Sequence, residues 1–416
     1  MDQTRNNLNL NDNDCMSECL GKGLIVPTDL VHKLTVNGNT KPYYVFKVKL
    51  DLLYYNNENG RIASWIKKYE SENGKLSMED MDAYNDAIQK MIWDSNPDSM
   101  VSTKTNIEMI GQQVPGVILP DGRVIDGNRR FTCLRELYKE GKGDEFGYFE
   151  TTILDGNYGP NDKAIKALEL SLQLGAEKPV DYGPIEAMID IYDNVKRTER
   201  FTLEEYTRYA NMKTSEAKRL LERAELMVEF LDYIDAKDQY YIAREMKLDG
   251  PINEAVSILK KCKSKKEQDR MKTAIFTTFL LEPDQDMTRF VRNLKKIANT
   301  DASEDYLDQT EEIAINVLDD LSSSDKGTTL EKIGEIRSDR EMQDKICHLT
   351  DRAVNKVEIQ AARNIPLSLS EAALTNVIDI DRKLIDQLDD EGKAEFLERL
   401  DELEAAIARI RDYVKQ

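Results

Sequence analysis

The chain has 416 residues, a formal net charge of −20 and an apolar content of 40%. That length exceeds one ordinary core, so we expect two or three domains, and the composition excludes wholesale disorder. No stretch is long and apolar enough for a membrane span, and the N-terminus lacks a signal-peptide pattern, so we expect a cytoplasmic protein with no membrane partner. The acidic balance argues against binding of a phosphate backbone by the whole surface, but it allows a local basic patch.

The five cysteines and two histidines restrict the chemistry that the chain can perform. An odd, scattered set of cysteines is not the pattern of a disulfide framework. Cys15 and Cys19 are four residues apart but lack a second Cys or His pair, so a zinc site is not expected. With His32 and His348 as the only histidines, a Ser-His or Cys-His nucleophile is not expected either.

The first 180 residues predict a mixed α/β region after a loose, Asn- and Asp-rich tail at 1–20. The expected elements are, in order, a strand at 41–55, a polar loop at 56–61, helices between 63 and 113, short strands at 116–119 and 123–125, a helix at 130–140, a strand at 149–154 and a helix at 161–174. Ser77 and Asp80 are the expected capping residues of the middle helix before 113. The turn between the two short strands is signalled by Pro-Asp-Gly.

Beyond about residue 180 the pattern is helical, with no convincing strand, and its clearest break is SSSDKG at 322–327. From Asp381 onward, apolar residues recur with a 4-3-4-3-4 spacing, at Phe396, Leu400, Leu403, Ile407, Ile410 and Val414. Such a seam suits either a terminal helix packed on its own domain or a helix that associates with itself.

The stretch PGVILPDGRVIDGNRRFTCLREL, residues 115–137, places two adjacent arginines where a helix begins. A strand, a tight turn at Asp126 and Gly127, and a helix start together attract an anion, because the first N–H groups of the helix are free and its dipole is positive there. Gly127 lets the backbone approach the anion closely, and Arg129 and Arg130 could add charge-assisted contacts to phosphate. The alternative is that both arginines form surface ion pairs in an acidic protein.

This stretch resembles the second box of the ParB family, within the ParB/sulfiredoxin-like superfamily, in its order of helix, Gly, Pro, strand, turn, strand, charged box and helix. The loop at 56–61 resembles the first box of that family, and residues 167–188 resemble its third. Residues 201–226 are similar to the helix-turn-helix that follows the third box, with Asn211 at the turn, where asparagine tolerates a left-handed backbone.

The resemblance implies an α+β ParB/sulfiredoxin-like N-terminal domain, then an all-α helix-turn-helix domain, then an α-helical C-terminal region. The corresponding division of the chain is a tail at 1–20, a nucleotide-binding domain at 21–180, a helix-turn-helix domain at 181–245 and a helical domain at 246–416 that could associate with itself.

The resemblance also implies that CTP, or another nucleoside triphosphate, binds with Mg²⁺, is slowly hydrolysed, and controls a homodimer on DNA. Carried over to this sequence, the nucleotide-binding residues are Asn59, Arg61, Asp126, Gly127, Asn128, Arg129, Arg130 and Gln173. The metal candidates are the carboxylates of Asp126 and Glu169. The DNA-binding candidates on the second helix of the motif are Ser215, Lys218 and Arg219.

Three functions stay open at this point. The first is a nucleotide-binding DNA switch for plasmid or phage partition or for regulation. The second is a nuclease or phosphotransferase on the same scaffold, for which a phage-defence module is one setting. The third is a ligand-free module whose C-terminal helices bind a protein. Asn128 replaces the family's Glu, and residues 170–174 lack the Glu, Asn and Arg of the third box, which bears on metal-assisted hydrolysis more than on binding. The basic run KKCKSKK at 260–266 either extends a DNA-binding face or is a solvated loop.

Overall fold

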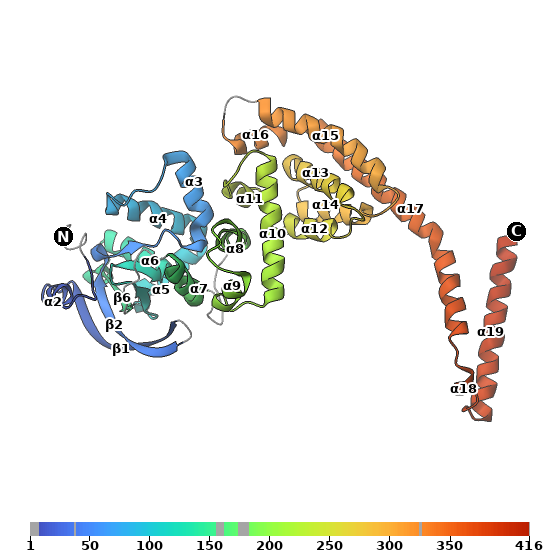
Figure 1. Cartoon of the computed structure of the whole chain (residues 1–416), viewed down its shortest axis with the longest axis horizontal. Coiled ribbons are helices and arrows are strands. Elements are labelled where there is room, and N and C mark those ends of the chain that lie inside the picture. Colours follow the sequence, from blue (N-terminus) through green and yellow to red (C-terminus); the bar gives the residue numbers. More distant parts are fainter. Residues whose placement is uncertain (1–7, 37–38, 155–161, 174–182, 324–326, 416) are drawn as a thin grey trace. The chain divides into compact units, whose positions relative to one another are not determined.

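Figure 1 shows the computed structural model of the whole chain, in which the described residues are 8–36, 39–154, 162–173, 183–323 and 327–415. The chain divides into two compact units, residues 1–351 and residues 352–416. The first unit begins with a mixed sheet and helices and continues as helices alone, and the second unit is helical.

One six-stranded mixed sheet, with the order β1-β2-β6-β4-β5-β3, organises the N-terminal part of the first unit. Its strands are β1 (Ile25–Val36), β2 (Asn39–Lys49), β3 (Tyr54–Tyr55), β4 (Gly116–Ile118), β5 (Arg123–Asp126) and β6 (Tyr148–Ile153). The pairs β1–β2, β2–β6 and β4–β5 are antiparallel, whereas β3–β5 and β4–β6 are parallel. The end of β5, where the two arginines follow, therefore lies beside the inner strand β4.

Helices cover both faces of this sheet, and successive residues of its short strands therefore enter two different hydrophobic clusters. Val124 of β5 belongs to a core shared with α4, α5 and α6, whereas its neighbour Ile125 packs with α7 on the opposite face. The helices and short 3₁₀ turns of this part are α2 (Asn13–Gly21), η1 (Leu50–Leu52), η2 (Gly60–Ile62), α3 (Ala63–Asn73), α4 (Met81–Ser95), α5 (Pro97–Ile110), α6 (Asn128–Lys139), η3 (Asp144–Gly147) and α7 (Asp162–Gln173). Asp80 caps α4 by accepting hydrogen bonds from the N–H groups of Asp82 and Ala83, which confirms one of the two expected caps.

The sequence predicts a loose tail over residues 1–20, but residues 8–20 are packed, and residues 1–7 lie outside the described residues. Residues 13–21 form α2, and Leu8, Leu10 and Cys19 are buried in the core of the sheet domain. The backbone N–H of Leu10 also donates to the carbonyl of Pro120 at 2.9 Å. These three buried apolar residues pack the segment onto the core, although the composition of the segment is mainly polar.

Strand β1 is a further element that the sequence did not predict, and the single strand expected at 41–55 is instead divided into β2, η1 and β3. Strand β1 lies at the edge of the sheet and pairs only with β2, so one of its sides needs no partner strand. Its register shifts between Pro27 and Val31, and Leu30 and Val31 are more than half exposed. The shift and the exposure remove the alternation of apolar and polar residues by which a half-buried strand is recognised.

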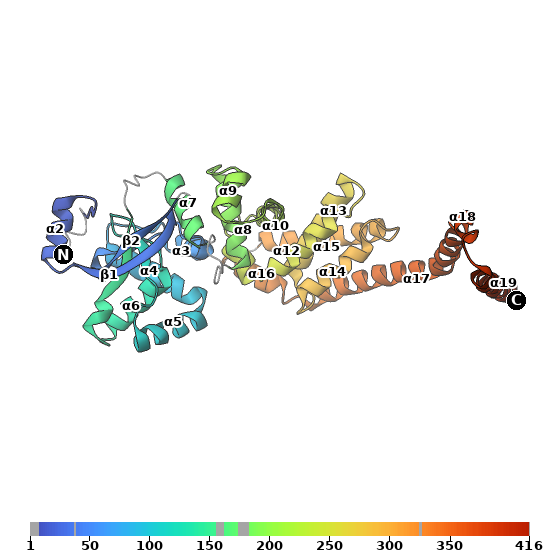
Figure 2. The same ribbon diagram turned by 90° about the horizontal axis from the view of Figure 1, so that it is seen from below.

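The rest of the first unit is helical, and none of the described residues from 183 onward forms a strand, as the sequence predicts. The elements are α8 (Pro184–Tyr192), the π-helical turn η4 (Asp193–Arg197), α9 (Leu203–Tyr209), α10 (Thr214–Tyr233), α11 (Tyr241–Glu245), α12 (Asp249–Leu259), α13 (Lys265–Leu281), α14 (Met287–Ile297), α15 (Ser303–Ser323), α16 (Thr329–Ile336) and the start of α17 (Arg340–Ile378). Helix α10 packs against α8 and α9 on one side and against α12 on the other (Figures 1 and 2). Between α9 and α10, Asn211 has a φ of 49°, which confirms the predicted left-handed turn residue.

The second unit consists of the C-terminal part of α17, the short α18 (Arg382–Ile385) and the long α19 (Asp390–Lys415). None of the described residues from 354 to 415 is buried. In the apolar seam of α19, Leu403, Ile407 and Ile410 are 39%, 52% and 66% exposed. Among the described residues, none of the helices of either unit combines the length and apolarity that a membrane crossing requires.

Candidate site at the start of helix α6

Gly127 makes the sharp connection between β5 and α6. It is the N-cap of α6 and has a φ of 91°, in the left-handed region that glycine adopts without strain. A Cβ at this position would lie 2.9 Å from Cζ of Phe149 and 3.3 Å from Cα of Gly116. The predicted tight turn is thus confirmed, and the helix begins at Asn128, two residues before the predicted start.

The two arginines after this turn point to different partners. Arg130 donates from Nη2 to Oδ2 of Asp126 at 3.1 Å and to the carbonyl oxygen of Pro115 at 3.4 Å. Arg129 donates from Nη1 to Oγ of Ser99 in α5 at 2.5 Å. Arg130 therefore forms an ion pair within its own turn, as the alternative interpretation of these arginines expected, and an incoming phosphate would compete with the Asp126 carboxylate for it.

Several polar atoms around the turn have unused hydrogen-bonding capacity. Asn128 is 8% exposed, and its Oδ1 accepts no hydrogen bond from the described residues. Nε of Arg130 and Nδ1 of His32, on β1, are likewise buried and without a hydrogen-bond partner among the described residues. Burial and the nearby Arg130 lower the pKa of His32, against the opposing effect of Asp126, so this histidine is neutral at pH 7. Because buried polar atoms normally have partners, these atoms mark a place where a ligand or water would be held.

The first-box candidates shape a neighbouring loop. Asn59 is buried, and its Oδ1 accepts a hydrogen bond from the backbone N–H of Arg61 at 3.1 Å, which caps the turn η2. Arg61 itself is half-buried. The N–H of Gly60 donates to Oε1 of Glu169 at 3.1 Å, so this loop is fastened to α7.

A buried charge network that the sequence did not reveal lies behind this loop. Nζ of Lys166, on α7, is 2.7 Å from Oδ1 of Asp190 and 3.0 Å from Oε2 of Glu169, and it also donates to the carbonyl oxygen of Glu58 at 3.0 Å. Each of the three charged side chains is at most 4% exposed. Burial lowers the pKa of Lys166, but the two carboxylates outweigh it and the net shift is upward, so the lysine stays charged. Burial raises the pKa of Glu169; the nearby Lys166 opposes the shift, and the charge of Asp190 adds to it.

The same network reaches the first helix of the α9–α10 pair. Asp190, on α8, accepts through Oδ2 a hydrogen bond from the hydroxyl of Tyr206 on α9 at 2.9 Å. Asn194 donates to the side chain of Asp190, and Arg200 in turn donates to Oδ1 of Asn194 at 3.2 Å and to Glu58 at 3.5 Å. The loop at 58–60 is therefore joined by hydrogen bonds and ion pairs to α7, α8 and α9.

A cavity of about 230 Å³ opens beside the network, between the loop at 57–60, α3 and α8. Four cations line it, and each is paired with a carboxylate: Lys67 with Glu70, Lys166 with Asp190, Arg197 with Asp193 and Arg200 with Glu58. The cavity therefore has no evident excess of positive charge for an anionic ligand. The sequence signal for this region was available in retrospect, since Lys166 and Glu169 interrupt the apolar run at 164–170 and Asp190 stands between two isoleucines.

The two metal candidates lie in separate ion pairs. Asp126 is held by Arg130, and Glu169 is held by Lys166. Across the described residues, no group of three or more His, Cys, Asp or Glu side chains is arranged to hold a metal ion. Gln173 is the last residue of α7, and its side chain falls outside the described part of the structure. Mg²⁺ coordination at Asp126 or Glu169 stays a prediction.

Cys133, on α6, is packed in the core of the sheet and its helices. It is fully buried, and burial raises the pKa of its thiol to about 12. A thiol in this state is a poor nucleophile, because the reactive form is the thiolate.

The three DNA-binding candidates share an exposed face of α10. Ser215, Lys218 and Arg219 are all exposed, and their spacing of three and four residues places them on one side of the helix. They lie in its first two turns, directly after the Asn211 turn.

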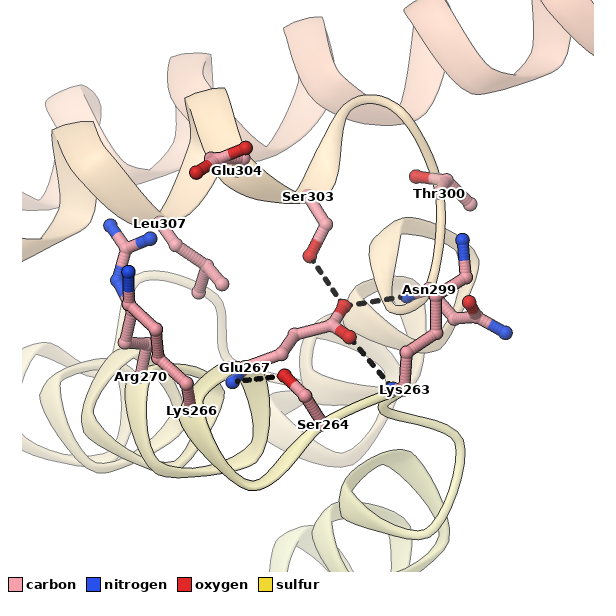
Figure 3. Close-up of a pocket in the computed structure, with 10 residues that line it drawn as sticks. All are labelled: Lys263, Ser264, Lys266, Glu267, Arg270, Asn299, Thr300, Ser303, Glu304 and Leu307. Carbon is pink, nitrogen blue, oxygen red and sulfur yellow. Dashed lines mark hydrogen bonds between the residues drawn. The ribbon is translucent and has the colours of Figure 1, made fainter.

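A pocket at the start of α13 has a carboxylate of its own at its centre (Figure 3). Oε1 of Glu267 accepts hydrogen bonds from the N–H of Asn299 at 2.9 Å and from the hydroxyl of Ser303 at 2.8 Å. Oε2 accepts from the N–H of Lys263 at 2.8 Å. Burial opposes ionisation, but these hydrogen bonds prevail and lower the pKa of Glu267. The carboxylate fastens α13 to the α14–α15 connection and occupies the position that an anion would take.

No family model, curated protein or solved structure matches this chain. The resemblance to the ParB family therefore stays a prediction. The physical basis for a function lies in the turn at Gly127, the buried network beside it and the exposed face of α10.

Proposed function

We propose that this chain is a ParB-like DNA-binding switch protein that binds a nucleoside triphosphate of the CTP type, with Mg²⁺, at the start of α6. Plasmid or phage partition, or regulation, is the role that fits such a switch. The observation that carries the proposal is the turn at Gly127, where a left-handed glycine opens the helix beside the buried Asn128 and the Arg130 guanidinium. A helix start of this kind presents free N–H groups and a positive dipole end to a phosphate.

Binding at this turn requires Arg130 to exchange partners. A phosphate oxygen takes the place of the Asp126 carboxylate and also engages Nε of Arg130, which is buried without a partner among the described residues. The released Asp126 carboxylate would then be available to hold the Mg²⁺ that accompanies the triphosphate. The Oδ1 atom of Asn128 would accept a hydrogen bond from a hydroxyl of the nucleotide.

The network around Lys166 supports a link between the ligand and α10. It fastens the loop at 58–60 to α7 and α8 and, through Tyr206, to α9, the helix that precedes α10. A ligand that shifts this loop changes the surroundings of Asp190, and with them the anchoring of α9. In this proposal α9 and α10 form a helix-turn-helix, and Ser215, Lys218 and Arg219 contact DNA.

The proposal includes a homodimer formed through α19. The apolar seam of α19 is exposed in the single chain. Residues 390–404 contain seven acidic and two basic side chains, whereas 405–416 contain three basic and one acidic. An antiparallel pair of α19 helices would place the acidic half of one against the basic half of the other while covering both seams. A protein partner on the same seam is the alternative.

Isothermal titration calorimetry of the full chain with CTP and Mg²⁺ tests the nucleotide site. We expect saturable binding by the wild type and a loss of affinity of at least about 30-fold in Arg130→Ala, since a hydrogen-bonded charge contributes roughly 2–3 kcal/mol. The matched control is Arg292→Ala, because the Arg292 side chain is 57% exposed on α14 and its loss leaves the site intact. The absence of any binding heat at millimolar CTP in the wild type would rule the proposal out.

A further inference from the structure

We infer that the DNA-binding surface continues from α10 onto five lysines at the α12–α13 connection and the end of α14, where Lys260 neutralises a carboxylate of α10 and the other four contact the phosphate backbone. These residues, called here the lysine surface, are Lys260, Lys261, Lys263, Lys295 and Lys296. The inference rests on the proposed function, because it takes α10 to be the helix that meets DNA.

A carboxylate of α10, Glu222, lies on the same face as the DNA-binding candidates, and Lys260 of the lysine surface neutralises it. Glu222 follows Ser215 by seven residues and Lys218 by four, so it lies on the same side of the helix as the DNA-binding candidates. An unpaired carboxylate there would repel phosphate. Nζ of Lys260 is 2.5 Å from Oε2 of Glu222, so the ion pair removes the repulsion and attaches the α12–α13 connection to α10.

The lysines come from two segments that the fold brings together. Lys261 donates from Nζ to the backbone carbonyl of Lys295 at 2.7 Å, which joins the α12–α13 connection to the last turn of α14. All five lysines of the surface are exposed. Residues 260–300 contain eleven Lys and Arg against five Asp and Glu, in a chain whose net charge is −20. A local positive excess in an acidic protein is the charge distribution that a site for a polyanion requires.

The carboxylate within this connection does not cancel the positive charge at the surface. Glu267 turns inward, where its oxygens accept hydrogen bonds from Ser303 and from the N–H groups of Lys263 and Asn299 (Figure 3). The boundary of the surface lies on the other side of α13, where Arg270 pairs with Asp308 and Glu311. That side is acidic and does not face DNA in this arrangement.

The spacing suits a DNA duplex. Seven residues of α-helix separate Ser215 from Glu222, a rise of about 10 Å. The major groove of B-DNA is about 12 Å wide, so a helix whose first turns enter the groove places its third turn near the flanking backbone. The lysine surface is attached at that third turn through Lys260. Contacts of this kind fix the position of a protein on the duplex and strengthen binding to every sequence equally.

Fluorescence anisotropy of the full chain with a random-sequence duplex, across a salt series, tests the inference. We expect Lys261→Ala/Lys263→Ala to weaken binding and to lower the slope of log K against log salt by about 2, because each phosphate contact contributes close to 1. The matched control is Lys265→Ala/Lys266→Ala, which removes the same charge from the same basic run. Lys265 pairs with Asp269, and Lys266 lies beside Glu304 on the acidic side, so this control should bind like the wild type. Thermal melting of each variant checks that it is folded.

A second pair of variants separates a direct contact from a structural effect. Lys260→Ala should weaken DNA binding by exposing the charge of Glu222, and adding Glu222→Gln should restore most of the loss. If Arg219→Ala weakens DNA binding but the lysine variants bind DNA like the wild type, the inference is overturned and the proposed function is kept. A wild type that binds no DNA at low salt would overturn both this inference and the DNA-binding part of the proposed function.

Discussion

The two units of the chain show what an apolar stripe does with and without a partner. In α14 of the first unit, Phe290, Leu294 and Ile297 recur on one face and are at most 6% exposed. In α19 of the second unit, Leu403 and Ile407 recur in the same manner and are 39% and 52% exposed. Both sequences encode an amphipathic helix, but only the first unit supplies a surface that covers it. The second unit therefore needs a further surface, and the proposal assigns that role to a second copy of α19.

Charged substitutions in the apolar seam of α19 should have the largest effect, because they prevent a second copy of the helix from covering it. We expect the wild type to form a dimer and Leu403→Asp/Ile410→Asp to be monomeric, with the dissociation constant raised roughly 1,000-fold or more, because four carboxylates per dimer would each cost about 1–3 kcal/mol when buried. Size-exclusion chromatography with light scattering measures the mass. The melting temperature of the first unit should not change. A wild type that is monomeric at every concentration would contradict self-association.

Replacing the buried Lys166 tests how strongly a buried ion pair stabilises the first unit. Lys166→Met leaves Glu169 and Asp190 without their shared cation, and we expect a loss of about 3–5 kcal/mol in the free energy of unfolding. The counterpart in the second unit is Arg399→Met, whose ion pair with Glu402 is well exposed, and there we expect less than about 0.5 kcal/mol. Urea denaturation followed by circular dichroism gives both values, and equal effects would contradict the comparison.

The pH dependence of the stability of Glu169→Gln tests the ionisation of this buried carboxyl group. Burial raises the pKa of Glu169 in the folded state above its ordinary value of 4.5, so its contribution to stability is complete below that value and is lost as the pH rises through the folded pKa. Glutamine cannot ionise, so the variant should gain stability relative to the wild type as the pH is raised from about 4.5. Urea midpoints of the two proteins over a pH series measure the difference. A constant difference would show that Glu169 does not titrate abnormally.

One leucine from each amphipathic helix gives the most closely matched test. Leu294→Ala in α14 removes a fully buried side chain, and we expect a loss of about 2–5 kcal/mol in the free energy of unfolding. Leu403→Ala in α19 removes a partly exposed one, and at protein concentrations where the chain is monomeric we expect less than about 0.5 kcal/mol. Urea denaturation at low protein concentration is the measurement. A large effect of Leu403→Ala under those conditions would mean that α19 is covered within its own chain.

The sequence predicts the parts of the fold that depend on local backbone chemistry. Asp80 at a helix start, Gly127 in a tight turn and Asn211 in a left-handed turn each follow from what one residue type permits. The N-terminal helix α2 and the edge strand β1 were missed because few apolar anchors hold the first and a register shift breaks the pattern of the second.

The arrangement around the site was less accessible to prediction because it depends on contacts between distant segments. The adjacent Arg129 and Arg130 look equivalent in sequence, yet one reaches Ser99 of α5 and the other pairs with Asp126. The pairing of Lys166 with Asp190 likewise joins two helices whose packing no local pattern reveals. The nucleotide, the metal ion and the DNA contacts stay proposals that these contacts support.

A crystal or cryo-EM structure of the full chain with CTP and Mg²⁺ would show whether the nucleotide binds at the Gly127 turn. We expect triphosphate density against the N–H groups of Asn128 and Arg129, with the Arg130 guanidinium turned from Asp126 onto phosphate and the Asp126 carboxylate beside the metal. An empty turn at saturating nucleotide, with Arg130 still paired to Asp126, would contradict it.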